Sequence, residues 1–242
     1  MPTCRNRRFS VATATSLLAS ALLYSPMIAA DETEYRVIPY LWTAGMDVEV
    51  GRPGQTTDAD VDFSDYMEFI DTGAAFIFDA VGEKWSFLSN IMYVELSEDI
   101  GLPAGTVDIE IKESIFELAA GYRPERFEKV RVLAGVRYTE LEADIEFASS
   151  VDFNKSESWW DPFIGLEWRP HQGKWEYYVE GDIGGGVDAD FAWQVALGAT
   201  RHFNEKYAVT VGYRYLDIDY EDNDFIFDGN LEGVQIGLMF KF

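Results

Sequence analysis

The sequence predicts an all-β protein, a transmembrane antiparallel up-and-down β-barrel of about ten strands, within a range of eight to twelve. Three observations predict this fold. Apolar and polar residues alternate along most of the chain, glycines recur on the polar face of the alternating segments, and the links between segments are alternately short and long. No segment after residue 30 approaches the roughly 18 uninterrupted apolar residues that a membrane-spanning helix needs.

The alternation is clearest in six segments. The last of them places Val234, Ile236, Leu238, Phe240 and Phe242 on one face. The same rule holds in 130–138, 160–168, 175–183, 193–200 and 207–215. Because successive side chains of a strand point to opposite faces, each segment has one bulky apolar face and one small or charged face.

Less regular alternation predicts four further strands, in 34–49, 73–81, 85–96 and 106–122. The apolar face of 106–122 changes between Glu113 and Ser114, which predicts a β-bulge there. Pro39 and Pro162 are unusual inside strands and predict bulges or strand ends. The segment 64–71 has the pattern of a short helix capped by Ser64.

The polar face indicates which side of each strand meets lipid. Glycines recur on it about once per strand, at Gly121, Gly135, Gly165, Gly198, Gly212 and Gly237. Outside a soluble barrel these glycines would weaken the strands without packing anything. Inside a narrow lumen they make room for charged side chains that pair. We therefore expect a lumen network of Arg131, Arg137, Arg214, Glu167, Glu176, Glu180 and Asp182. Asp79, Glu117 and Asp161 should face the same arginines.

The links divide into two kinds. Short ones occupy 82–84, 123–129, 169–174 and 202–206, and they alternate with mostly longer, more acidic ones at 51–71, 97–105, 144–158 and 217–228. Short turns on one side and larger loops on the other are typical of outer-membrane barrels. Aromatic residues border the short links, at Trp85, Tyr122, Trp168, Trp175 and Tyr207, and Phe240 and Phe242 end the chain. We expect these aromatics to form a girdle at the periplasmic interface.

The first thirty residues predict a cleaved signal peptide (1–30), followed by the barrel domain (31–242). Arg5, Arg7 and Arg8 precede an uncharged run from Val11 to Leu23, and small residues lie at the expected cleavage point. Cleavage would remove the only cysteine, Cys4, and would leave 16 basic against 43 acidic residues, a net charge near −27. Such a surface excludes nucleic acid as a partner.

The leader, the cysteine-free mature chain, the amphipathic strands and the ending "GLMFKF" together resemble those of a Gram-negative outer-membrane β-barrel protein. The stretches "PYLWTAGMDVEVG", "VDFSDYMEF" and "MYVELS" are similar to a group of small proteobacterial barrels. The resemblance implies export through the periplasm, residence in the bacterial outer membrane, and contact with its lipid and lipopolysaccharide. It also implies Leu238, Phe240 and Phe242 as the signal read by the barrel-assembly machinery.

The sequence favours a non-catalytic role, either structural or in surface interaction, or in the passage of small solutes with cation preference if the lumen is open. His171 and His202 both fall in short turns, away from the extracellular side where barrel enzymes carry catalytic histidines. Two alternatives stay open. One is a lipid A-modifying outer-membrane enzyme, and the other is a soluble periplasmic barrel that binds an apolar ligand.

The acidic loops predict at most weak binding of divalent cations, and no other cofactor. Oxygen ligands are dense at Asp58, Asp60, Asp62, Asp219, Asp222 and Asp224, which could hold Ca²⁺ or bridge Mg²⁺ to lipopolysaccharide phosphates. Neither acidic stretch has the spacing of a dedicated calcium loop, which needs a turn glycine and a bidentate glutamate at set positions. A solvated acidic rim is therefore the favoured interpretation.

Overall fold

The computed structural model describes residues 33–52, 55–61, 70–102, 105–147, 153–186, 189–221 and 225–242. The predicted signal peptide lies outside these residues, and so does most of the predicted helix at 64–71, whose last two residues belong to a strand. No helix in the described part of the chain is long and apolar enough to cross a membrane.

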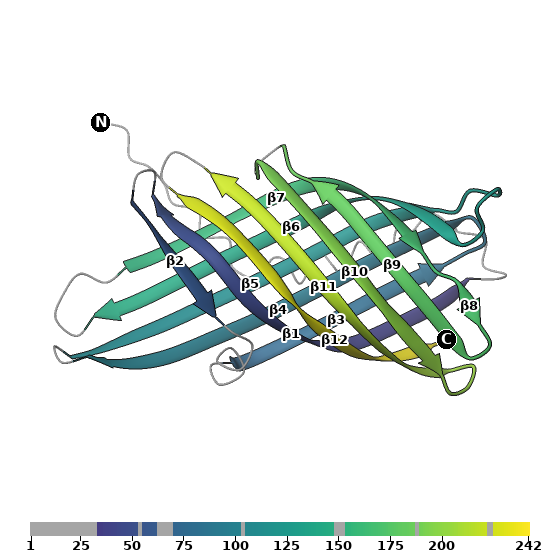
Figure 1. The fold of residues 1–242 in the computed structure, drawn as a ribbon, viewed down its shortest axis with the longest axis horizontal. Coiled ribbons are helices and arrows are strands. Elements are labelled where there is room, and N and C mark those ends of the chain that lie inside the picture. The colour runs from purple at the N-terminus through teal and green to yellow at the C-terminus, as the bar shows by residue number, and fades with distance from the viewer. Residues whose placement is uncertain are drawn as a thin grey trace, which may run out of the picture. The chain divides into compact units, whose positions relative to one another are not determined.

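Ten antiparallel strands of the described residues form a closed barrel (Figure 1), which confirms the predicted fold class. They are β1 (Glu34–Arg52), β3 (Ile70–Val81), β4 (Trp85–Leu102), β5 (Gly105–Tyr122), β6 (Val130–Phe147), β7 (Phe153–Trp168), β9 (Trp175–Gly184), β10 (Phe191–His202), β11 (Tyr207–Glu221) and β12 (Ile226–Lys241). Each strand pairs with its neighbours along the chain, and pairing of β12 with β1 closes the ring. Two short strands are added to it. β2 (Gln55–Val61) pairs antiparallel with the last residues of β1, and β8 (His171–Gln172) pairs with β9.

The two ends of the barrel differ. At one end, the short-turn end, tight links join β3 to β4, β5 to β6, β7 to β9 and β10 to β11. Both ends of the barrel sequence meet there, since the Phe242 amide donates to the Tyr35 carbonyl over 2.9 Å. The opposite end, the loop end, carries the other connections and the extensions of the longest strands.

Apolar side chains cover the outside of the barrel and charged ones are enclosed. Val211, Ile183 and Leu238 are 48%, 53% and 53% exposed, whereas Arg137 and Glu176 are fully buried. Exposed aromatics surround the short-turn end at Trp85, Tyr122, Trp168, Trp175 and Tyr207. Because an exposed apolar belt is stable only against hydrocarbon, this arrangement fits a membrane lipid environment.

The interior has two halves. Toward the short-turn end, most inward side chains are charged or polar, with a small apolar cluster of Ile38, Ala208 and Met239 among them. Toward the loop end, an apolar plug fills the lumen, and it consists of Met92, Ile115, Trp159, Ala189, Ala192, Leu216, Ile218, Tyr220, Phe225 and Phe227. The rings of Trp159 and Tyr220 stack within it at 4.4 Å between centroids. A protein core therefore occupies the loop-end half of the lumen.

The apolar plug corrects one prediction. The bulge expected between Glu113 and Ser114 is wrong, because β5 keeps an unbroken register with both β4 and β6 across these residues. Ile115 points inward and is 1% exposed, so the apparent change of face marks the point where the lumen itself becomes apolar. The register shift on this part of the sheet lies instead between Ile70 and Thr72.

Pro39 and Pro162 lie inside their strands, each where pairing with one neighbour stops. The β1–β3 ladder ends at the pair Pro39 and Phe76. The β7–β9 ladder begins at Phe163, one residue after Pro162. Since proline has no N–H to donate, it is tolerated where a ladder on one side is no longer required.

Candidate functional site

The candidate site is the polar half of the lumen, which begins with a rim cluster at the short-turn end. This cluster consists of Arg36, Asp79, Arg131, Glu167, Arg169 and Glu176. Arg131 donates from Nη1 to Asp79 over 2.7 Å and from Nη2 to Glu167 over 2.9 Å. Arg169 lies 2.6 Å from Glu167 and donates from Nη1 to Glu176 over 2.9 Å. Each buried charge thus has an opposite partner, which a low-dielectric interior requires.

Deeper in the barrel lies a polar layer of Asn90, Glu117, Arg137, Asp182, Gln194 and Arg214. Glu117 is its centre and accepts hydrogen bonds from Arg137 Nε at 2.8 Å, Gln194 Nε2 at 3.0 Å and Asn90 Nδ2 at 2.8 Å. Arg137 also donates to Asp182 over 2.8 Å. The layer joins side chains of β4, β5, β6, β9, β10 and β11, so it ties opposite walls of the barrel together.

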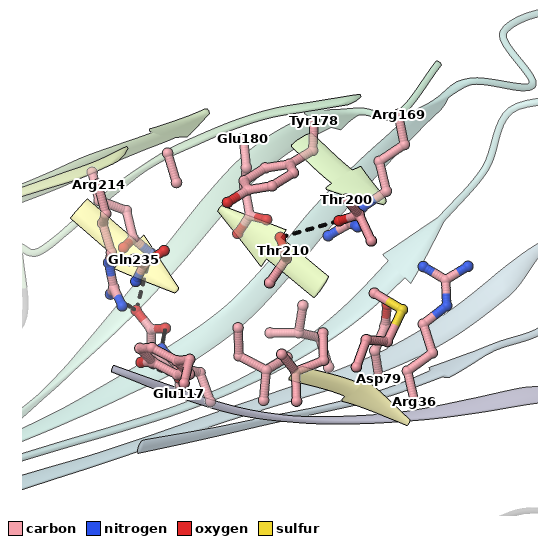
Figure 2. Close-up of a pocket in the computed structure, with 18 residues that line it drawn as sticks. Arg36, Asp79, Glu117, Arg169, Tyr178, Glu180, Thr200, Thr210, Arg214 and Gln235 are labelled. Carbon is pink, nitrogen blue, oxygen red and sulfur yellow. Dashed lines mark hydrogen bonds and ion pairs between the residues drawn. The ribbon is translucent and has the colours of Figure 1, made fainter. Parts of the chain in front are cut away.

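A cavity of about 80 Å³ separates the rim cluster from the polar layer (Figure 2). Tyr178 and Glu180 of β9 line it, together with Thr200 and Thr210, whose hydroxyls are hydrogen-bonded at 3.1 Å. Tyr178 lies across Gly198 and Gly212, where any Cβ would collide with its hydroxyl. These two glycines therefore make room for an aromatic ring inside the lumen. The cavity is large enough for a few water molecules only.

The structure brings most of the predicted lumen network together in two places. Arg131, Glu167 and Glu176 belong to the rim cluster, and Arg137, Arg214 and Asp182 to the polar layer. Glu180 lines the cavity between them. The prediction omitted four partners, Arg36, Asn90, Arg169 and Gln194. Asn90 and Gln194 lie on the same inward face as charged residues of their strands, so the alternation could have indicated them. Arg169 lies in a turn beyond the end of its strand, where alternation gives no indication.

Three of the six predicted acidic cation ligands lie on strands that the structure describes. Asp58 and Asp60 belong to β2, and Asp219 is exposed on β11. Asp62, Asp222 and Asp224 lie outside the residues that the structure describes. Within the described residues, the group with metal-ligating geometry is His171, Glu176 and His202, at the short-turn end.

The C-terminal residues lie on the outer face of the closing strand. Leu238 is 53% and Phe242 79% exposed. Phe240 packs its ring edge-on against Tyr207 of β11, with 5.8 Å between centroids. All three side chains are therefore presented outward.

The fold is known from solved structures, whereas the sequence has no close match. No protein-family model matches the chain, and no curated protein matches it. The chain is similar to the translocator domain of autotransporter NalP from Neisseria meningitidis, with 14% identity, 96% of each chain covered and a TM-score of 0.51. It is also similar to the outer membrane protease OmpT from Escherichia coli, with 11% identity, 90% of this chain and 99% of that one covered, and a TM-score of 0.50.

At these identities the likeness shows the fold alone. The class of protein is nevertheless defined: this chain has the fold of a Gram-negative outer-membrane β-barrel, with an apolar outer surface and a charged interior.

Proposed function

We propose that this protein is an integral outer-membrane barrel without catalytic turnover, whose lumen is closed and whose acidic loop end interacts with cationic groups at the cell surface. The observation that carries the proposal is the filling of the lumen. Arg137, Leu216 and Leu231 are fully buried, and the polar layer and the apolar plug follow one another along the barrel. A role in the passage of solutes would need an open path through both.

Strand length supports a role for the loop end. β4, β5 and β6 have 18 residues each. A tilted strand crosses the bilayer with about 9–11 residues. Since the exposed aromatics fix one membrane interface at the short turns, about 7–9 residues of each strand project beyond the other interface. At about 3.3 Å per residue and a tilt of about 40°, the projection is roughly 20 Å.

Acids also lie directly opposite one another toward the loop end of β11 and β12. In register, Asp219 of β11 lies directly opposite Asp228 of β12. Like charges in directly opposed positions destabilise a sheet unless cations offset them. We infer that divalent cations or a cationic partner offset the repulsion between these acids. This inference agrees with a role in surface interaction.

The proposed surface role is tested by binding of a nona-lysine peptide to the refolded protein in nanodiscs. Neutralising loop-end acids (Asp47→Asn, Glu49→Gln, Asp219→Asn and Asp228→Asn together) should weaken binding and reduce its salt dependence. The matched control neutralises short-turn acids (Glu83→Gln, Glu125→Gln, Glu128→Gln and Glu205→Gln) and should leave binding unchanged. Equal effects of the two sets would contradict the proposal.

The lipid A-modifying alternative is disfavoured by the histidines, since both lie at the short-turn end rather than at the loop end. Release or transfer of an acyl chain from lipid A by the refolded protein would establish that alternative. The soluble alternative predicts that the protein stays in the supernatant when membranes are sedimented. Sedimentation with the outer-membrane fraction would exclude it.

We further propose that the outward-facing Leu238, Phe240 and Phe242 are read during assembly, with the barrel-assembly machinery and lipopolysaccharide as partners in biogenesis. Deletion of Phe242 should reduce the heat-modifiable form in outer-membrane fractions. Unchanged amounts of that form would argue against a terminal assembly signal.

A further inference from the structure

The only two histidines of the chain converge on one carboxylate. His171 comes from β8 and His202 from the end of β10, and Glu176 lies on β9 between them. Nε2 of His171 is 2.6 Å and Nε2 of His202 is 3.9 Å from Oε2 of Glu176. The three ligand atoms all lie within 4.8 Å of one another. We infer that His171, Glu176 and His202 form a binding site for a Zn²⁺-class divalent metal ion at the short-turn end.

Two atoms of the cluster, Oε2 of Glu176 and Nε2 of His202, lack an ordinary hydrogen bond. The Glu176 side chain is fully buried, and its Oε2 has only the 2.6 Å ion-pair contact with His171, which requires a proton on that imidazole. The partly buried His202 Nε2 has no hydrogen-bond partner among the described residues. Buried polar atoms in native proteins are nearly always satisfied by protein, water or an ion. A metal ion between the three residues would satisfy both atoms.

The backbone holds the ligands in place. His171 lies directly opposite Glu176 in the β8–β9 ladder. Thr200 lies opposite Glu176 in the β9–β10 ladder, so His202 follows two residues later on the same face. The amide of His202 donates to the Lys174 carbonyl over 2.9 Å, and the amide of Tyr177 donates to the Pro170 carbonyl over 2.9 Å. A metal site built on paired strands is preorganised before the ion binds.

The other carboxylate oxygen is oriented by arginine. Oε1 of Glu176 accepts from Arg169 Nη1 at 2.9 Å and lies 3.7 Å from Arg36 Nη1. This arrangement turns Oε2 toward the histidines, as outer-shell partners of metal-binding carboxylates do. The charges of both arginines are offset locally, since Arg169 pairs with Glu167 and Arg36 with Glu34.

The ligand types select the class of metal. Two imidazoles and one carboxylate suit Zn²⁺, Cu²⁺ or Ni²⁺, whereas Ca²⁺ and Mg²⁺ require more oxygen ligands. Bond lengths to Zn²⁺ of about 2.0–2.2 Å need only a small adjustment of these side chains, and the His171 side chain is half-exposed. His171 and Glu176 also border a cavity of about 270 Å³, so a fourth position would be open to water or to an anion.

The test is a Zn²⁺ titration of the refolded barrel in detergent, prepared without a histidine tag and treated with chelator. Millimolar Ca²⁺ is included to occupy the acids of the loop end. We expect one equivalent of Zn²⁺ to bind by calorimetry, and Cu²⁺ in its place to show nitrogen ligation by electron paramagnetic resonance. Loss of an outer-shell partner typically weakens metal binding by about 10–100-fold. Because His171 and His202 would bind the ion directly, His171→Ala and His202→Ala should each weaken Zn²⁺ binding by more than this.

Lys174→Ala, in the same turn, is the matched control and should bind Zn²⁺ as the unmodified protein does. Heat-modifiable migration on gels checks that each variant is folded, and if His202→Ala fails to fold, the half-exposed His171→Ala decides the question alone. Absence of stoichiometric binding to the unmodified protein would overturn the inference. Binding that survives in a folded histidine variant, or that is lost equally in Lys174→Ala, would overturn it as well.

Discussion

The two halves of the lumen lie on the same inward face of the same strands, yet they are built from opposite kinds of residue. On β11, Arg214 belongs to the polar layer, whereas Leu216, Ile218 and Tyr220 belong to the apolar plug. The polar half is held by directional ion pairs that cross the barrel, and the apolar half by close packing. The inside of a barrel with an apolar exterior thus need not be polar throughout.

This difference predicts how each half responds to change. In the polar half each charge depends on its partner, because removing one member leaves the other buried and uncompensated. In the apolar half a new charge at Ile218 lies among the apolar side chains of the plug. Substitutions of the same kind should therefore have different effects according to the half in which they fall.

The largest effect should come from Ile218→Arg, which places a charge in the apolar plug, where Ile218 is 1% exposed. Its cost to the free energy of unfolding should be at least about 3–5 kcal/mol, typical of an uncompensated buried charge. Thr210→Arg lies on the same strand and face, beside Glu180 in the polar half, and should cost less. Urea unfolding of the refolded barrels measures both, and equal costs would remove the distinction between the halves.

Glu117→Ala tests the polar half. The change leaves Arg137, and with it Arg214 at 3.5 Å from the carboxylate, without their central acceptor. We expect a loss of about 3–5 kcal/mol in the free energy of unfolding. Glu83→Ala, in a short turn, is the control and should leave unfolding unchanged. A loss below about 1 kcal/mol for Glu117→Ala would mean that the polar layer is not structural.

Val211→Arg tests the cost of placing a charge on the outer face of the barrel instead of in the lumen. Val211 is 48% exposed on the apolar belt, next to the lumen-facing Thr210. An arginine toward lipid near the midplane should cost about 2–4 kcal/mol. The measurement is again urea unfolding, in lipid vesicles, and a cost near zero would show that this surface does not meet hydrocarbon.

The smallest effect concerns the short turns, outside the membrane-spanning segments. Lys84 donates a hydrogen bond to Glu125 over 2.5 Å and, by this bond and its charge, lowers the pKa of the Glu125 carboxyl below its usual range. The pair therefore contributes stability above the unfolded-state pKa of Glu125, which is lost as the pH falls through the lower folded-state pKa. Nuclear magnetic resonance titration should show the Glu125 pKa rising in Lys84→Ala. An unchanged pKa would mean that the pair does not persist in solution.

The sequence was sufficient to predict the barrel because the outer face of six segments is regularly apolar, as at Tyr207, Val209, Val211 and Tyr213. It also indicated most of the polar half, since Arg131, Arg137 and Asp182 fall on the small-residue face. The apolar plug could not be predicted in the same way. Where both faces of a strand are apolar, the alternation disappears. The inward-facing Ile115 therefore gave the false indication that the strand changes face.

The approach of the two histidines to Glu176 was also beyond the sequence. His171 and His202 are 31 residues apart, and their meeting depends on the register of three strands and on the length of one turn. Alternation places residues on a face, but it does not fix their height along the barrel. The convergence of the two histidines on Glu176 therefore required the structure.

The closed lumen is tested most directly by single-channel recording in planar lipid bilayers. With the polar layer and the apolar plug in place, the refolded protein should insert without producing discrete conductance steps. Replacement of Trp159, Leu216 and Phe227 by glycine in one variant serves as the comparison, because it removes much of the plug. Reproducible, cation-preferring steps from the unmodified protein would contradict a closed lumen and establish a role in solute passage.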